Sequence, residues 1–278
     1  ARLDSEPRLV IERGRDADLV IAGGVESMSR APYVMGKAES AFGREQRLED
    51  TTMGWRFVNP RMHASHGVDS MTQTAENLAR ELSIARADQD AYALRSQRRT
   101  QQARVDGAFA AELMEMPPLP DHPEANADEQ PRADTTLAKL AALPPLLGPG
   151  TTITAGNASG INDGACALLL ASDAALARWR LEPLARVLGT ASAGVAPRIM
   201  GIGPVAAATR LLARLGLHLD DFGRIEINEA FAAQVLAVTR ALGLPDDAAH
   251  VNPNGGAIAL GHPLGASGAR LALTATRE

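Results

Sequence analysis

The stretch that decides the fold is residues 252–270, which read NPNGGAIALGHPLGASGAR. Five glycines and two prolines surround a single histidine, His262. Glycine permits tight turns and close backbone approach, and proline fixes φ and removes a hydrogen-bond donor. His262 is therefore held by its backbone, as we expect of a side chain directed at a reacting atom. These residues alone leave a second interpretation open, a glycine-rich turn before a helix that starts near Leu264.

The composition around this stretch is that of an ordinary globular protein. The chain has 278 residues, of which 45% are hydrophobic and 22% charged, which predicts one large or two medium domains. The net charge of −5 argues against a nucleic-acid partner. No apolar run approaches the roughly 18 residues that span a membrane, and no secretory signal opens the sequence, so we expect a cytoplasmic protein. The first residue is Ala and the last residues continue a helical pattern, so we expect a sequence truncated at both ends.

Cysteine and histidine usage limits the kinds of site. The single cysteine, Cys166, excludes an internal disulfide and a multi-cysteine metal site. It lies in the apolar run 163–170, where we expect it to pack as a small hydrophobic residue. His63 and His66 lie in the weakly periodic stretch 36–70 without a third ligand nearby, so we expect no metal site.

The rest of the chain predicts strands and helices in alternation, which favours a sheet with helices on its faces. Upstream we expect a strand at 17–22 closed by Gly23 and Gly24, and a surface excursion over 36–70. Two helices follow between Thr74 and Phe109, with Ser83 as the cap of the second. Residues 1–16 resemble the tail of a helix, and residues 117–150 form a proline-rich connector with a short helix over 135–143. Downstream, strands are predicted at 165–171, 185–191, 222–227 and 249–251, and helices at 172–179, 204–215 and 229–242.

Four segments together resemble the thiolase family. They read IAGGVESMS at 21–29, TAGNASGINDGA at 154–165, NEAFA at 228–232, and the glycine-rich stretch at 255–268. The segments follow the family order over nearly the whole chain. Residues 54–60, GWRFVNP, further resemble the 3-oxoadipyl-CoA thiolase branch.

The resemblance implies an α/β fold, a layered αβαβα core of two similar halves with an inserted loop domain, the first half being incomplete. Residues 1–34 and 162–182 would be the remnant of the N-terminal half, and residues 183–278 an incomplete C-terminal half. Residues 35–161 would form the inserted loop domain that covers coenzyme A. The complete form would be a homodimer or homotetramer.

The resemblance also implies a chemistry, in which a carbon–carbon bond is made or broken beside a thioester. A cysteine carries the acyl group and a second cysteine moves a proton. The family motifs that hold these two cysteines are absent from this chain and Cys166 matches neither, so we expect the chain alone to be inactive. His262 matches a histidine that helps to activate the nucleophile and lines an oxyanion hole. Asn228 matches an asparagine that holds a water in the same hole, although its position also suits a helix N-cap.

Coenzyme A or acyl-CoA is the implied substrate, and no permanently bound cofactor is expected. The residues that match the pantetheine loop are Ser159, Gly160 and Ile161. Those that match apolar contacts to the pantetheine are Ala155, Met71, Met200, Ala230 and Phe231. Arg132 matches a cation near the nucleotide end. Core packing is the alternative for the apolar group and simple solvation for Arg132. Ser70 stands where some relatives have a histidine.

Other functions stay open beside this one. The acyl group could be 3-oxoadipyl, a straight-chain 3-oxoacyl or acetoacetyl. A non-catalytic thiolase-like protein that binds acyl-CoA is the alternative. A Rossmann nucleotide site is set aside, because Gly261, Gly265 and Gly268 lack the required spacing.

Overall fold

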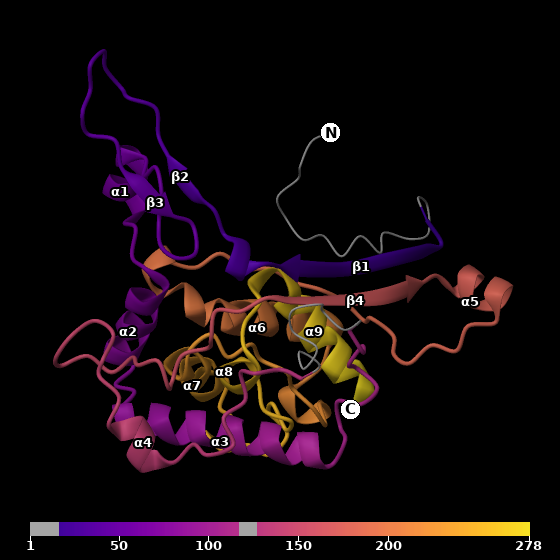
Figure 1. Cartoon of the computed structure of the whole chain (residues 1–278). Helices are drawn as coiled ribbons and strands as arrows, with labels where there is room; N and C mark the ends of the chain where they lie inside the picture. Colours follow the sequence, from indigo (N-terminus) through magenta and orange to yellow (C-terminus); the bar gives the residue numbers. More distant parts are fainter. Residues whose placement is uncertain (1–16, 117–126) are drawn as a thin grey trace.

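The computed structural model describes residues 17–116 and 127–278. The helix tail expected in residues 1–16 and the first part of the proline-rich connector lie outside these ranges. Within the described part of the chain, a long two-stranded sheet lies above a body of helices, and a thin arm projects at one end (Figure 1).

The long sheet pairs two segments that are far apart in the sequence. Strand β1 (Leu19–Glu26) runs antiparallel to β4 (Gly164–Ala171), with Leu19 opposite Ala171 and Glu26 opposite Gly164. Both predicted strands are confirmed. The expectation that Gly23 and Gly24 close the first strand is wrong, because both glycines remain paired with β4.

Helix α9 (Leu264–Arg277) packs against one face of this sheet and confirms the helix predicted from Leu264. The approach is close, since a Cβ atom placed on Gly24 would lie 1.7 Å from the carbonyl oxygen of Gly265. Only glycine fits there. Glu26 Oε2 also accepts a hydrogen bond of 3.0 Å from Gly265 N. The sheet thus fixes the start of α9, two residues after His262.

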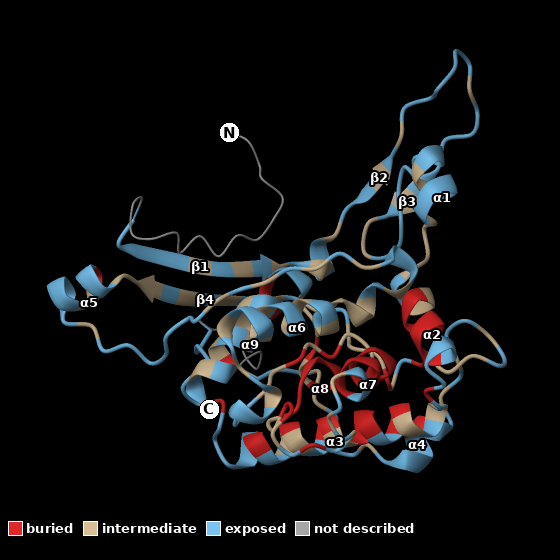
Figure 2. Cartoon of the chain, turned by 180° about the vertical axis from the view of Figure 1, so that it is seen from behind, coloured by how far each residue is buried: buried red, intermediate tan, exposed pale blue. Residues whose placement is uncertain are grey.

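The arm, residues 33–66, contains a small hairpin and a short helix. Strands β2 (Tyr33–Met35) and β3 (Leu48–Asp50) pair antiparallel, after the short 3₁₀ helix η1 (Met28–Arg30). Helix α1 (Pro60–His66) is capped by Asn59. Most arm residues are exposed (Figure 2). The surface excursion expected at 36–70 is therefore present, with its own hairpin.

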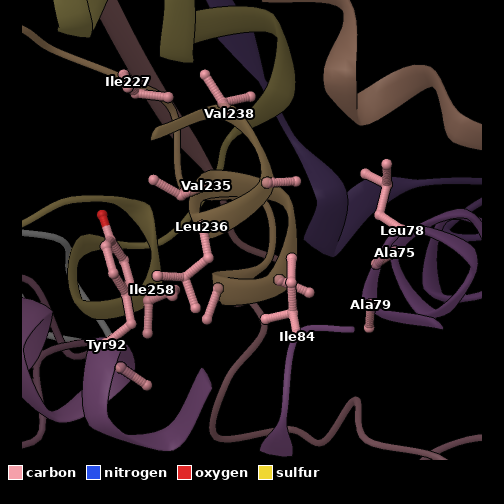
Figure 3. Packing of buried hydrophobic residues seen from close by; sticks show 14 of the residues in the cluster. Ala75, Leu78, Ala79, Ile84, Tyr92, Ile227, Val235, Leu236, Val238 and Ile258 are labelled. Carbon is pink, nitrogen blue, oxygen red and sulfur yellow. The ribbon is translucent and has the colours of Figure 1, made fainter. Parts of the chain in front are cut away.

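The hydrophobic core lies in the helical body. It gathers around α7 (Ala232–Ala241), which packs against α2 (Met71–Glu81) and α3 (Arg86–Val105). Tyr92, Leu236 and Ile258 lie close together in Figure 3, and Leu78 lies farther along the same cluster, beside Ala75. The body also includes α4 (Leu137–Ala141), which confirms the short helix expected in the connector, and α8 (Ala257–Leu260). Red in Figure 2 marks how burial concentrates in these elements.

One capping prediction in this body is wrong. Helix α3 begins at Arg86 after Ala85, which makes no side-chain cap. Ser83 instead has a positive φ of 52° in the turn between α2 and α3. The sharp turn after α2 needs a left-handed residue before the second helix can start, so Ser83 is two residues too early to cap it.

The downstream helices agree with the sequence better than the strands do. Helices α5 (Asp173–Trp179) and α6 (Gly203–Leu215) are confirmed, the second preceded by the 3₁₀ helix η2 (Pro197–Ile202) and followed by η3 (Leu219–Asp221). The strand predicted at 185–191 is irregular chain, and those at 222–227 and 249–251 reduce to one parallel bridge between Ile225 and Val251. A strand needs a neighbouring strand, and within the described residues these segments have none on which to build a ladder.

Candidate active site

His262 lies in the tight connection between α8 and α9. Gly261 before it has a φ of +94°, which favours glycine. The amide of His262 donates to Asn162 Oδ1 at 2.8 Å and to the carbonyl oxygen of Gly160 at 3.2 Å. A Cβ on Gly261 would stand 2.4 Å from Asn162 Oδ1. The loop at 160–162 and the glycine-rich turn therefore hold each other in place.

The hydrogen bonds of the imidazole assign its tautomer. His262 Nδ1 lies 2.6 Å from Ser267 Oγ, and Ser267 Oγ donates to the carbonyl oxygen of Pro263 at 3.0 Å. Because a hydroxyl has one proton, Ser267 must accept from Nδ1–H. Nε2 then carries a lone pair. Burial, with a smaller contribution from Arg270, lowers the pKa of His262 below its usual value of 6.5, which favours the neutral ring.

Asn228 meets that lone pair. Its Nδ2 lies 3.2 Å from His262 Nε2, although 34 residues separate the two in sequence. Asn228 Oδ1 is buried and has no hydrogen-bond partner among residues 17–116 and 127–278. The pair thus presents one amide donor, one carbonyl acceptor and one basic nitrogen at a common point.

Asn228 is not a helix N-cap. Helix α7 begins at Ala232, with Phe231 in the cap position. The chain before it is extended, because the carbonyl of Ala230 accepts from Ser159 N at 3.0 Å and Ala158 bridges Phe231. This pairing delays the helix by three residues and leaves the Asn228 side chain free to reach His262.

A buried carboxylate beside Asn228 joins the surrounding elements. Glu229 is fully buried and accepts four hydrogen bonds, and its donors come from α3, from the glycine-rich stretch and from α8. These donors are Tyr92 Oη at 2.9 Å, Ser96 Oγ at 2.6 Å, Asn252 Nδ2 at 3.0 Å and Ile258 N at 3.1 Å. Burial and then the charge of Glu229 raise the pKa of Tyr92 well above 10.0, so the phenol remains a donor. The sequence analysis missed Glu229, although a glutamate between an apolar strand and a helix was a signal for it.

Asn252 completes this connection. It has a positive φ of 45° and exchanges hydrogen bonds with the backbone of Ile227, donating to its carbonyl at 2.8 Å and accepting from its amide at 2.7 Å. The segment that carries Asn228 is thereby tied to the stretch that carries His262. The 3.2 Å contact between their side chains follows from this backbone arrangement.

The remaining candidate residues fall around two cavities. The first, of about 390 Å³, is lined by Arg132, Ala155 and Gly160 together with Gln130 and Lys139. The second, of about 580 Å³, is lined by Met71 and Ser70 and by residues of the arm. Outside both linings lie Ser159, Ile161, Met200, Ala230 and Phe231; Ser159, Ala230 and Phe231 belong to the paired segments beside Asn228.

Gln97 connects the first cavity to the glycine-rich stretch. Its Oε1 accepts from Arg132 N at 2.8 Å, and its Nε2 donates to the carbonyl of Ile258 at 3.3 Å. The side chain of Gln97 is buried on α3. The backbone of the Arg132 segment is therefore anchored to α8, the helix that leads into His262.

Two family models match the chain, one described as the thiolase N-terminal domain over residues 11–174 and one as the thiolase C-terminal domain over residues 181–278. The chain belongs to the thiolase family. It is 62% identical over 265 residues to a beta-ketoadipyl-CoA thiolase of Pseudomonas knackmussii. It is 58% identical over 267 residues to a 3-oxoadipyl-CoA/3-oxo-5,6-dehydrosuberyl-CoA thiolase of Escherichia coli. In both cases the match covers 95% of this chain, and the chain spans 66% of the relative's length.

Solved thiolases confirm the fold. The human mitochondrial 3-ketoacyl-CoA thiolase superposes with a TM-score of 0.85 at 41% identity, covering 94% of this chain and 65% of that one. The same human enzyme in complex with CoA superposes with a TM-score of 0.83 at 42% identity, covering 94% of this chain and 64% of that one. The family and the thiolase-like α/β fold expected from the four motifs are therefore correct.

Within this thiolase chain, Cys166 has the environment of a packing residue. It is half-buried on β4, and burial, followed by the charge of Glu112, raises the pKa of its thiol. A reactive cysteine needs a lowered pKa. The observation agrees with the packing role expected from the apolar strand.

A second buried carboxylate was also missed by the sequence analysis. Both oxygens of Glu226 are buried without a hydrogen bond among the described residues, and Arg270 Nη1 lies 3.8 Å from Oε2. Burial raises the pKa of Glu226 to about 8, because loss of hydration outweighs the attraction of Arg270. In the sequence Glu226 sits between Ile225 and Ile227, where alternation gave no sign that it faces inward.

The described residues contain no group of three or more His, Cys, Asp or Glu side chains arranged to hold a metal ion. Among those same residues, no helix combines the length and apolar character needed to cross a membrane.

Proposed function

We propose that the protein is a thiolase-type acyltransferase that acts on 3-oxoadipyl-CoA and coenzyme A through a cysteine thioester. The observation that carries this proposal is the 3.2 Å contact between the lone pair of His262 Nε2 and Asn228 Nδ2. Relatives at 62% and 58% identity are named for beta-ketoadipyl-CoA and 3-oxoadipyl-CoA, which supports a dicarboxylic 3-oxoacyl group as the substrate. The chain spans 66% of the length of those relatives, so assigning their substrates to it is part of this proposal.

The geometry gives His262 two successive roles. In the neutral ring, the Nε2 lone pair that accepts from Asn228 Nδ2 is the basic site, and it takes the proton of an attacking thiol when the thiol replaces the Asn228 amide as its partner. The resulting Nε2–H then points at the position where a thioester oxygen gains charge, and it donates to that oxygen. Ser267 accepts from Nδ1–H in both states and so keeps the ring oriented throughout.

Asn228 completes the proposed oxyanion site. Its unpartnered Oδ1 accepts from a water, and that water is the second donor to the thioester oxygen. Glu229 and Asn252 hold the Asn228 segment without contacting substrate. His262 and Asn228 are thus the proposed catalytic residues, as the motifs predicted.

Coenzyme A is proposed to lie along the first cavity, with the pantetheine arm against Ala155, Ser159, Gly160 and Ile161. The cations Arg132 and Lys139 are near enough to share this lining and suit phosphate oxygens. The apolar contacts proposed for the pantetheine of coenzyme A are Met71, Met200, Ala230 and Phe231. The homodimeric or homotetrameric state, the cytoplasmic location and the boundaries of the two halves and the loop domain stay predictions.

This chain on its own is proposed to bind acyl-CoA without turning it over, because its one cysteine has a raised pKa on β4. The same observation favours the alternative function, a non-catalytic thiolase-like protein that binds acyl-CoA. The two functions share the binding site and differ in whether an acyl group is ever transferred.

The test measures binding and transfer separately. We expect the chain to bind acetoacetyl-CoA more tightly than free coenzyme A in calorimetry, and His262→Ala or Asn228→Ala to remove that difference. The exposed His63→Ala serves as the matched control. Exchange of labelled coenzyme A into acetoacetyl-CoA is expected to be absent for this chain.

Two outcomes would contradict these proposals. Equal affinities for acetoacetyl-CoA and free coenzyme A in the unmodified chain would show that His262 and Asn228 do not recognise the thioester. Label exchange that is lost in His262→Ala would refute the inactivity of the chain while supporting the acyltransferase.

A further inference from the structure

The arm meets the start of α2 (Figure 1), and residues from both line the second cavity. Trp55, Arg56 and Phe57 line it from the arm, and Ser70 and Met71 line it from α2, around a volume of about 580 Å³. The lining is largely apolar and contains one cation, Arg56, and one carboxylate, Asp69. Trp55, Arg56 and Phe57 belong to the GWRFVNP segment, which the catalytic geometry leaves without a role.

The backbone of this segment is shaped to present Arg56. Gly54 and Phe57, on either side of the Trp55–Arg56 pair, have positive φ values of 80° and 48°. Trp55 Nε1 donates to the carbonyl of Asp69 at 3.2 Å, and Phe57 N donates to Glu49 Oε2 at 3.2 Å. These bonds attach the segment to β3 and to Asp69, the residue before the N-cap of α2. The conformation of the loop is therefore fixed by hydrogen bonds at two points.

The guanidinium of Arg56 retains donors for a ligand. Among the described residues its hydrogen bond is that of Nη1 to the carbonyl of Gly54, at 2.7 Å. Five N–H groups in a planar fork suit a carboxylate, which can take two of them at once. An apolar cavity with one such fork fits a short hydrocarbon chain that ends in a carboxylate.

Asp69, which lines the cavity, and Asp50, on whose pKa Arg56 acts, already have their own donors. Asp69 Oδ2 accepts from Asn77 Nδ2 at 2.8 Å. Asp50 Oδ1 accepts from Thr52 N and Thr52 Oγ1, bonds that lower its pKa, and Arg56 is only the least of the contributions to that shift. Neither side chain therefore occupies the fork of Arg56.

Packing connects this cavity to the catalytic pair. Asn77 donates both to Asp69 and to the carbonyl of Arg198 in η2, at 2.9 Å. Helix η2, which carries Met200, packs on α2 and on α7, the helix that follows Asn228. These contacts tie the cavity wall formed by Asp69 to the helix that follows Asn228.

We propose that this cavity binds the terminal carboxylate of a dicarboxylic acyl group, with Arg56 as its charged partner. The inference rests on the proposed acyltransferase function and deepens it, since it assigns the residue that distinguishes a dicarboxylic acyl-CoA from a monocarboxylic one. An uncharged chain end would gain nothing from Arg56, whereas a carboxylate gains a charge-assisted pair.

The test compares succinyl-CoA, which ends in a carboxylate, with butyryl-CoA, which has the same chain length and no charge. In calorimetry with the full chain, we expect succinyl-CoA to bind at least about tenfold more tightly, as one charge-assisted pair predicts. Arg56→Gln should remove this preference and leave butyryl-CoA and free coenzyme A unchanged. Arg56→Lys, which keeps the charge but loses the fork, should retain part of it.

Arg61→Gln, an exposed arginine on α1 outside the cavity lining, is the matched control and should keep the preference. A preference that survives in Arg56→Gln, or its absence from the unmodified chain, would overturn the assignment of Arg56. If the chain binds free coenzyme A but does not distinguish the two acyl groups, only this inference fails. If it binds no form of coenzyme A, the proposed function fails as well.

Discussion

At the scale of single residues, the hydroxyl of Ser267 has one proton and gives it to the carbonyl of Pro263. His262 must then place its own proton on Nδ1, and the basic nitrogen faces Asn228. A residue five positions along the chain thus determines which side of the imidazole is reactive. The pattern GHPLGASGAR indicated His262 but not this partner, because sequence spacing does not reveal which hydroxyl a helix turn brings to a ring nitrogen.

We expect Ser267→Ala to disturb this tautomer. Without an acceptor at Nδ1, the ring should populate both neutral forms, and ¹⁵N spectra of the imidazole should show averaged shifts in place of one protonated Nδ1. Ser267→Thr keeps the hydroxyl, so its ¹⁵N spectrum should match that of the unmodified chain. The unmodified chain should also titrate below 6.5. A titration at or above that value would contradict the buried, neutral ring.

Glu226 predicts how stability depends on pH. Its folded pKa of about 8 lies above the ordinary value of 4.5, so the folded state holds a proton that the unfolded state has released. The free energy of unfolding should therefore fall as pH rises through this window, by on the order of 3 kcal/mol. Glu226→Gln should flatten that dependence in urea denaturation, because the amide cannot ionise. An unmodified chain that gains stability from pH 5 to pH 8 would refute a protonated Glu226.

At the scale of elements, Glu229 joins α3, α8 and the segment before α7 through four hydrogen bonds. Elements that are far apart in sequence meet at one carboxylate in the interior. The site is therefore held by a polar junction in the interior of the helical body.

Removing that junction should be costly. We expect Glu229→Ala to lower the free energy of unfolding by roughly 3–5 kcal/mol, since four buried donors lose their acceptor. Glu229→Gln should cost less, because one oxygen still accepts. The exposed Glu39→Ala in the arm is the control and should change stability little. Chemical denaturation measures the free energy of unfolding of all three variants. A loss in Glu229→Ala as small as that in the control would show that the network does not stabilise the fold.

Elements were predictable from sequence where local signals suffice. Apolar runs that pair with each other form β1 and β4. Amphipathic runs form α2, α6 and α9, and the polar helical run after α2 forms α3. The segments at 185–191 and 222–227 carry the same apolar signal as β4, yet they form no ladder, because pairing is a property of the neighbour and not of the segment. The motifs identified His262 and Asn228, while Glu229, Glu226 and Ser267 needed three-dimensional contacts to emerge.

At the scale of the whole molecule, the core is unevenly placed. Among residues 17–116 and 127–278, the helical body buries its apolar residues, whereas one face of the β1–β4 sheet is exposed. Ile21 and Leu169 are paired across the strands and are 76% and 56% exposed, and Val25 on the same face is 72% exposed. The opposite face packs on α9. Exposed apolar faces of paired strands promote association.

We expect the chain to self-associate as its concentration rises, through this open face. Ile21→Lys should shift the distribution toward monomer in sedimentation velocity, because a charge would enter an apolar contact. Val105→Lys, at an equally exposed valine at the end of α3, should not. A concentration-independent monomer for the unmodified chain would contradict the prediction.

The tight contact between Gly24 and Gly265 has a consequence for the imidazole three residues before that helical glycine. A methyl group on position 24 would force α9 away from the sheet, and the turn that precedes the helix would move with it. The position of the imidazole therefore depends on a strand some 240 residues earlier in the sequence, where a residue with only a hydrogen atom as its side chain is needed. A Gly24→Ala substitution would therefore first displace the basic nitrogen of His262, before the fold itself is lost.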